Sequence, residues 1–191
     1  MDIESTFVPY CQIFETYIAA MYNDEFILID QHAAHEKIMY EILQSKGDNG
    51  SIQRLLIPEI IELTPDKAII LSQYIERFGE MGIEIEDFGK NSFKISAVPF
   101  FMDKYSPSEF VKDILEAIIS ESDSGDIIPL EKLRNIAACK SAIRAKRTLC
   151  IDEMKTLFNR LLKLKEPFFC PHGRPVIHKF SKSELEKLFK R

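Results

Sequence analysis

The chain changes from strand to helix within Glu25-Phe-Ile-Leu-Ile-Asp30-Gln-His-Ala-Ala-His-Glu-Lys-Ile-Met-Tyr-Glu-Ile-Leu-Gln44. The first six residues form a short apolar run, which predicts a buried strand. We expect a helix over residues 31–44. Asp30 then lies where the strand ends and the helix begins. At such a position a carboxylate serves as a helix N-cap or as part of a functional site.

The segments around this junction predict an α+β fold. Residues 6–21 are rich in β-branched and aromatic side chains and predict strands, which a turn at Asn23-Asp24 separates from the strand at 25–30. Pro58 favours an edge position for the next strand. Further predicted strands are 55–63, 82–86, 92–98 and 176–180, with a hairpin loop at 88–91 joining the middle pair.

Further helices follow from capping and turn signals. Thr64 and Pro65 predict a helix start, and Ser181 with Glu184 is spaced as a capping box before a terminal helix. The other predicted helices are 65–81, 107–120, 131–148 and 151–163. The loops at 46–51 and 121–126 are candidate boundaries around a separate α/β unit.

The composition is ordinary for a globular protein, with 46% apolar and 29% charged residues among 191. No apolar run approaches the roughly 20 residues that span a bilayer, and no signal peptide is visible. We therefore expect a cytoplasmic protein without a membrane partner. The four cysteines include no C-x-x-C pair, which argues against a thiol redox protein. Disulfides are not expected in that compartment.

The net charge of -5 conceals an uneven distribution. Residues 1–131 contain 9 Lys/Arg and 25 Asp/Glu, a balance of -16, whereas residues 132–191 contain 16 and 5, a balance of +11. This asymmetry predicts either a basic face for an anionic partner or a solvated helix surface. An acidic domain should bind DNA only weakly by itself, because phosphate contacts drive non-specific affinity.

Several metal-ligating residue types occur with suggestive spacing. His32 and Glu36 are one helical turn apart, directly after Asp30. Cys170-Pro171-His172 is a C-x-H pair in a loop stiffened by proline and glycine, and Cys139 lies among small residues. Together these side chains offer N, S and O donors suited to zinc. A bridging Glu36 could also hold two metals about 4 Å apart, as in phosphodiester cleavage. Spacing alone leaves open an N-cap, surface histidines, an ordinary turn and packed cysteines.

Four motifs together resemble the endonuclease-proficient MutL family of mismatch-repair proteins. Residues 30–41 fit the pattern DQHAxxExxxxE at every fixed position. Three further motifs occur in the family order: Ala138-Cys-Lys140, Cys170-Pro-His-Gly-Arg-Pro175 and Phe189-Lys-Arg191. The motifs cover both ends of the chain, and chance agreement of all four is very improbable.

This resemblance implies a metal-dependent endonuclease that nicks the newly made strand, close to the nucleoid. It implies zinc, with Mn²⁺ or Mg²⁺ as alternatives for turnover. The implied catalytic residues are Asp30, Glu36 and Glu41. The implied metal ligands are His32, Glu36, Cys139, Cys170 and His172. The implied supporting residues are Gln31, Lys140, Arg174 and Arg191, with Arg191 acting in its own subunit or across a dimer.

The resemblance also implies an architecture and partners. Residues 1–47 and 127–191 would form a dimerisation and endonuclease subdomain from both chain ends, with residues 48–126 inserted as a smaller external subdomain. The implied partners are a second copy, DNA, and the mismatch-recognition protein MutS through the full-length protein. The family's ATPase module is absent from this sequence, as expected for a C-terminal segment.

One segment resembles a sliding-clamp-binding peptide of the type Qxx(L/I)xP. It is Gln53-Arg-Leu-Leu-Ile-Pro58, in which Gln53, Leu56, Ile57 and Pro58 would make the contacts. An extended peptide of this kind places an amide and aliphatic anchors in a preformed apolar groove. The simpler interpretation is an edge strand that contains a proline.

The main competing function is a non-catalytic dimerisation module with a structural zinc. It would use the same cysteines and histidines, but it would need neither Asp30 nor a basic flank. Asp30 and the charge of residues 132–191 favour the nuclease.

Overall fold

The computed structural model describes residues 7–45, 52–99, 106–121, 127–144 and 148–190, without the side chains of 143 and 144. The chain divides into two compact units. Unit 1 is Met1–Ile38 with Ala142–Arg191, and unit 2 is Met39–Ser141. The helix α1 (Gln31–Gln44) begins in unit 1 and ends in unit 2.

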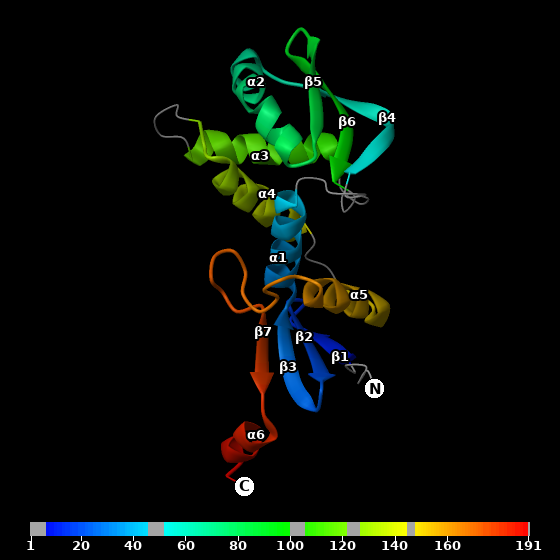
Figure 1. The fold of residues 1–191 in the computed structure, drawn as a ribbon, viewed down its shortest axis with the longest axis vertical. Coiled ribbons are helices and arrows are strands. Elements are labelled where there is room, and N and C mark those ends of the chain that lie inside the picture. The colour runs from blue at the N-terminus through cyan, green and yellow to red at the C-terminus, as the bar shows by residue number, and fades with distance from the viewer. Residues whose placement is uncertain (1–6, 46–51, 100–105, 122–126, 145–147, 191) are drawn as a thin grey trace. The chain divides into compact units, whose positions relative to one another are not determined.

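Unit 1 is built on a four-stranded antiparallel sheet (Figure 1). Its strands, in spatial order, are β1 (Phe7–Ile13), β2 (Tyr17–Tyr22), β3 (Glu25–Asp30) and β7 (Ile177–Phe180). Both hairpin turns have positive φ at two successive residues, Phe14-Glu15 and Asn23-Asp24. Asn23-Asp24 is a two-residue turn, the kind that matches the strand twist. Strands from both ends of the sequence therefore share one sheet.

Helix α5 (Ile151–Leu162) packs against this sheet through an aromatic cluster. The Phe158 ring stacks on Phe7, with centroids 3.9 Å apart, and meets Tyr22 edge-on at 5.0 Å. Phe158 is 1% exposed, so these ring contacts fix the helix on the strands.

The last helix, α6 (Lys182–Leu188), begins with the predicted capping box. The Ser181 hydroxyl accepts the Glu184 N–H, and the Glu184 carboxylate accepts the Ser181 N–H at 2.7 Å. The hydroxyl and then the backbone N–H of Ser181 hold the pKa of the exposed Glu184 below its ordinary value. None of the helix's own residues is buried.

Unit 2 contains a three-stranded antiparallel sheet covered by helices (Figure 1). The strands lie in the order β4 (Ile52–Glu62), β6 (Ser92–Pro99) and β5 (Glu84–Gly89), so β4 is at an edge, as Pro58 predicts. Helices α2 (Pro65–Glu80) and α3 (Pro107–Glu121) pack against the sheet. The core between them buries Phe78, Phe93 and Phe110.

Helix α4 (Leu130–Arg144) supports the same core and the end of α1. Leu133, Ala137 and Ala138 are fully buried. Arg134 Nε donates a 3.1 Å hydrogen bond to the Leu43 carbonyl in the last turn of α1. Such carbonyls have no partner within their own helix, so Arg134 closes that end of α1.

Most predicted elements are confirmed, and four details differ. The strand expected at 55–63 runs over Ile52–Glu62. Helix α4 ends at Arg144 rather than continuing to Thr148, which is not helical. Thr64 occupies the N-cap position of α2 but makes no side-chain cap bond, because its hydroxyl faces Asp66. The strand expected at 82–86 runs over Glu84–Gly89. The loops at 46–51 and 122–126, and Arg191, lie outside the described residues.

Candidate metal centre and docking segment

The junction between β3 and α1 is held by backbone bonds from two directions. The Asp30 N–H donates to the Val176 carbonyl, and the Gln31 N–H donates to the Thr16 carbonyl, each at 2.9 Å. Asp30 Oδ1 accepts the Ala33 N–H at 2.9 Å, so Asp30 is a helix N-cap. This cap uses one oxygen of the carboxylate, and the junction holds Asp30 in a defined place.

A relay of two amide side chains, which the sequence did not reveal, supports this junction. Gln31 is 2% exposed, and its Oε1 accepts a hydrogen bond from Gln12 Nε2. Gln12 Oε1 accepts the Leu149 N–H at 2.8 Å. Since a backbone N–H can only donate, it fixes which end of the Gln12 amide faces Gln31. Three segments distant in sequence, which carry Gln12, Gln31 and Leu149, are therefore hydrogen-bonded together at the start of α1.

The loop that carries Cys170 is closed on itself by backbone bonds. Val176 N–H donates to the Phe168 carbonyl at 2.8 Å, and Cys170 N–H donates to the Arg174 carbonyl at 2.9 Å. Gly173 N–H donates to the Cys170 carbonyl at 2.9 Å, and Gly173 has a φ of +76°. Glycine adopts this left-handed conformation without strain. The loop is thus stiff, and it leaves Cys170 only 4% exposed.

Within unit 1, α1 and this loop bring three metal-ligating groups together. The ligand atoms of Glu36, Cys170 and His172 lie within 4.8 Å of one another. His172 Nδ1 is 2.6 Å from Glu36 Oε1; the Glu36 side chain is 5% exposed and that of His172 is 47% exposed. A buried carboxylate is costly without a compensating cation or donor, and here the imidazole provides the donor.

This donor set fits zinc. Zinc takes nitrogen, thiolate and carboxylate ligands at about 2.0–2.3 Å, which places neighbouring ligands somewhat closer than the observed limit. A cation would also compensate the buried Glu36 carboxylate directly. Three protein ligands leave room for a fourth.

The other predicted site residues are distributed over both units. In unit 1, His32 is half-buried one turn before Glu36, but the described group of donors does not include it. Arg174 is exposed, and its carbonyl closes the Cys170 loop. Glu41, Cys139 and Lys140 are half-buried and fall in unit 2.

The clamp-type segment lies in unit 2 on the edge strand β4. Gln53 is exposed and pairs with Val98 of β6. Leu56 is 99% exposed and Ile57 is 79% exposed, and Pro58 is exposed as well. The proposed anchors are therefore outside the core, although Leu55 beside them packs against it.

These features define an α+β protein with a cluster of a buried carboxylate, a buried thiol and an exposed imidazole, whose helix begins with an acidic cap. The sequence matches the family described as MutL C terminal dimerisation domain over residues 10–149. The chain belongs to this family.

Similar full-length proteins carry the family name. The chain is 41% identical to the DNA mismatch repair protein MutL of Endomicrobium trichonymphae, over 94% of the chain and 30% of that protein. It is 39% identical to MutL of Clostridium perfringens (94% and 27%) and 37% identical to MutL of Staphylococcus epidermidis (96% and 30%). The chain thus spans under a third of these relatives. Among the described residues, no helix has the length and apolarity to cross a membrane.

Proposed function

We propose that the chain is the metal-dependent, DNA-nicking endonuclease domain of a MutL-type mismatch-repair protein. The observation that carries this proposal is the Glu36–Cys170–His172 cluster in the same unit as Asp30, which the cap holds at the start of the cluster's helix. A non-catalytic module would need this carboxylate only as the cap of the helix, which uses one of its two oxygens. The proposed endonuclease domain would act at the nucleoid, in the cytoplasm.

The ligand set would combine the observed cluster with one further side chain of unit 1. Glu36, Cys170 and His172 would hold zinc, and His32, one turn before Glu36 on the same helix, would be the fourth ligand. A divalent ion, whether Zn²⁺, Mn²⁺ or Mg²⁺, lowers the pKa of water and offsets charge on a phosphate when it is bound.

The chain's other polar residues would act around that ligand set. Asp30 would orient the attacking water through the carboxylate oxygen that the cap does not use. Glu36 would serve both as ligand and as catalytic carboxylate, with Glu41 as a further acid. Gln31 would keep the junction in place through Gln12, and Arg174 would contact phosphate.

The decisive experiment is nicking of supercoiled plasmid by Asp30→Asn. Asparagine caps helices as well as aspartate does, so the substitution removes the charge and keeps the cap. We expect a rate loss of about 100-fold or more, with an unchanged melting temperature. Asp24→Asn is the matched control, because Asp24 is exposed in a turn with positive φ that asparagine tolerates.

A dimerisation module with a structural zinc remains the second candidate, because the Asp30 carboxylate already has a structural role as a cap. Nicking by Asp30→Asn at the wild-type rate would remove Asp30 from the mechanism. Failure of the wild-type chain to nick with any of the three metals, despite bound zinc, would favour the module. Both functions include a homodimer, which sedimentation of the chain would test.

We further propose that the chain by itself binds DNA weakly and that a sliding clamp tethers it to DNA. Nine exposed cations lie in the described basic part of unit 1: Lys155, Arg160, Lys163, Lys165, Arg174, Lys179, Lys182, Lys187 and Lys190. The net charge of -5 opposes them, so affinity should be low and should fall further with salt. Gln53, Leu56, Ile57 and Pro58 would dock on the clamp, raising the local concentration of DNA. MutS would act through the full-length protein.

A further inference from the structure

The clamp-type segment departs from regular strand pairing. Arg54 pairs with Ala97 of β6, and the next paired residue, Glu59, faces Ile95. Residues 55–58 therefore face a single residue of β6, Ser96. We call these four residues the projecting loop. It turns Leu56 and Ile57 into solvent, at 99% and 79% exposure.

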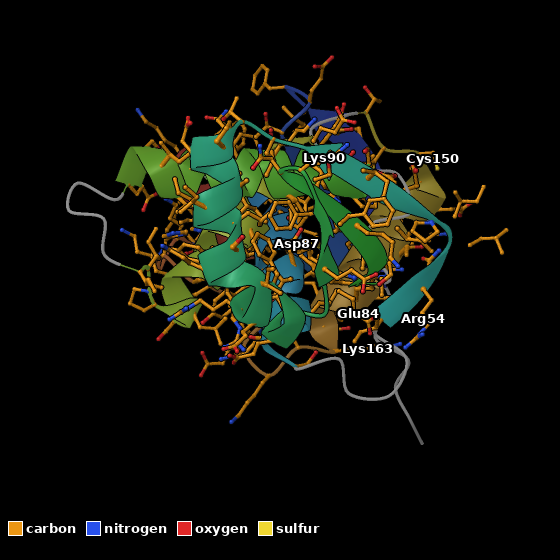
Figure 2. The ribbon with its side chains drawn as sticks, turned by 90° about the horizontal axis from the view of Figure 1, so that it is seen from above. Arg54, Glu84, Asp87, Lys90, Cys150 and Lys163 are labelled. Carbon is orange, nitrogen blue, oxygen red and sulfur yellow. The ribbon has the colours of Figure 1, made fainter. Side chains whose placement is uncertain are left out.

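The projecting loop is fixed at the end where it begins. Gln53 and Arg54 pair with Val98 and Ala97. The Arg54 guanidinium lies 3.8 Å from the Glu84 carboxylate of β5. Both side chains are labelled in Figure 2. Leu55 packs against the core of unit 2. The backbone pairing and the half-buried Leu55 side chain, rather than the exposed ion pair, supply most of this restraint.

The other end is fixed by Glu59, the residue directly after Pro58. Glu59 Oε2 accepts hydrogen bonds from the Ser106 hydroxyl and from the Ser108 N–H, each at 3.0 Å. Ser108 is in the first turn of α3, where backbone N–H groups lack partners within the helix and the helix dipole favours a carboxylate. A side chain of the edge strand thus caps a helix 49 residues later in the sequence.

We propose that Glu59 is a positioning residue for clamp binding, which holds the projecting loop in a preformed docking shape. The inference rests on the proposed clamp function. With both ends held, Leu56 and Ile57 enter the apolar groove of the clamp without first being ordered. Ordering side chains and backbone at an interface otherwise reduces affinity. Glu59 acts on the loop through α3 and does not touch the clamp.

The test compares the whole chain with a free peptide of residues 52–60, both binding to purified clamp. We expect Glu59→Ala to weaken binding of the chain by about 3- to 10-fold, the range expected for loss of preorganisation. The same substitution in the peptide should leave the dissociation constant unchanged, because the peptide has no α3. The wild-type chain should also bind more tightly than the wild-type peptide.

Two further variants control for charge and for folding. Glu62→Ala removes an equal charge from an exposed position of the same strand and should leave clamp binding unchanged. Ser106→Ala removes one of the two bonds to Glu59 from outside the peptide and should weaken binding in the same direction as Glu59→Ala. If Glu59→Ala unfolds the chain, the Ser106→Ala result decides.

Equal affinity of wild-type, Ser106→Ala and folded Glu59→Ala chains would overturn the inference while leaving clamp binding intact. A parallel loss in chain and peptide would also overturn it, since Glu59 would then contact the clamp. If neither the wild-type chain nor its peptide binds, the clamp function itself fails and the inference fails with it.

Discussion

Two short loops, one in each unit, are stiffened in similar ways and face opposite environments. The loop around Cys170 closes through its own backbone bonds and keeps the thiol at 4% exposure. The projecting loop at 55–58 is held at its two ends and leaves Leu56 at 99% exposure. The difference matches the two proposed ligands: a metal ion would need donors held inside the fold, whereas a partner protein would need anchors held in solvent, and both would need a rigid base.

The largest expected effect tests the loop around Cys170, called here the inward loop because its thiol is buried. Cys170→Ser should lower zinc affinity by at least about 100-fold, because loss of a ligand exceeds the effect of losing a residue that only orients one. Elemental analysis and a chelator competition would measure it. Cys11→Ser is the control, since Cys11 is also a free cysteine but is exposed on β1. Equal zinc in all three proteins would place the metal elsewhere.

The next effect tests the projecting loop at 55–58. The double substitution Gln53→Ala, Leu56→Ala should weaken clamp binding by about 30-fold, as expected for loss of a main anchor. The melting temperature and clamp-free nicking should not change, because Leu56 is not part of the core. Ile69→Ala on α2, another exposed aliphatic position at 64%, is the control. Clamp stimulation that survives the double substitution would reduce the segment to a strand.

The third prediction concerns the hydrogen bonds of Gln12, which connect three segments of unit 1 at the start of α1. Gln12→Ala removes the partners of the Leu149 N–H and of Gln31 Oε1. Loss of a partner by buried groups should lower the free energy of unfolding by about 1–3 kcal/mol, measured by urea denaturation. Gln73→Ala, at an exposed helical position, should change it by less than about 0.5 kcal/mol. A Gln12→Ala protein as stable as the Gln73→Ala control would remove the relay from the framework.

The smallest effect concerns the backbone of the inward loop. Gly173→Ala should destabilise by about 1 kcal/mol, because alanine disfavours the φ of +76° although its methyl group would meet no atom within 4 Å. Gly79→Ala in helix α2 also has open space and should instead stabilise by about 0.5–1 kcal/mol. Thermal melts of the two variants should therefore shift in opposite directions. A shift of the same sign in both would argue against the strained turn.

Local signals predicted most of the fold. Helix α1 runs over Gln31–Gln44 as expected, since strand and helix patterns meet there without an intervening loop. The Ser181–Glu184 box needs only residues three apart, and it formed. The end of α4 was misjudged because helical propensity continues past Arg144. A helix end depends on what the following residues contact.

The sites were less accessible to sequence reasoning, because their contacts are distant in the chain. Spacing alone left the His32–Glu36 pair and the C-x-H loop as separate fragments, and folding joins Glu36 to His172 across 136 positions. Gln12 and Glu59 carried no local signal, since their partners are at Gln31 and Leu149 and in α3. The identity of a polar residue in a strand does not predict which distant backbone group will donate a hydrogen bond to it.

The projecting loop has a consequence for the solubility of the chain. An edge strand such as β4 offers a row of backbone donors and acceptors on which a strand of another molecule can add, the first step of aggregation. Pro58 lacks an N–H, and residues 55–58 break the regular spacing of that row. A second β4 therefore cannot align along the full edge. The irregularity that leaves Leu56 exposed therefore also protects the sheet from unlimited addition of its own copies.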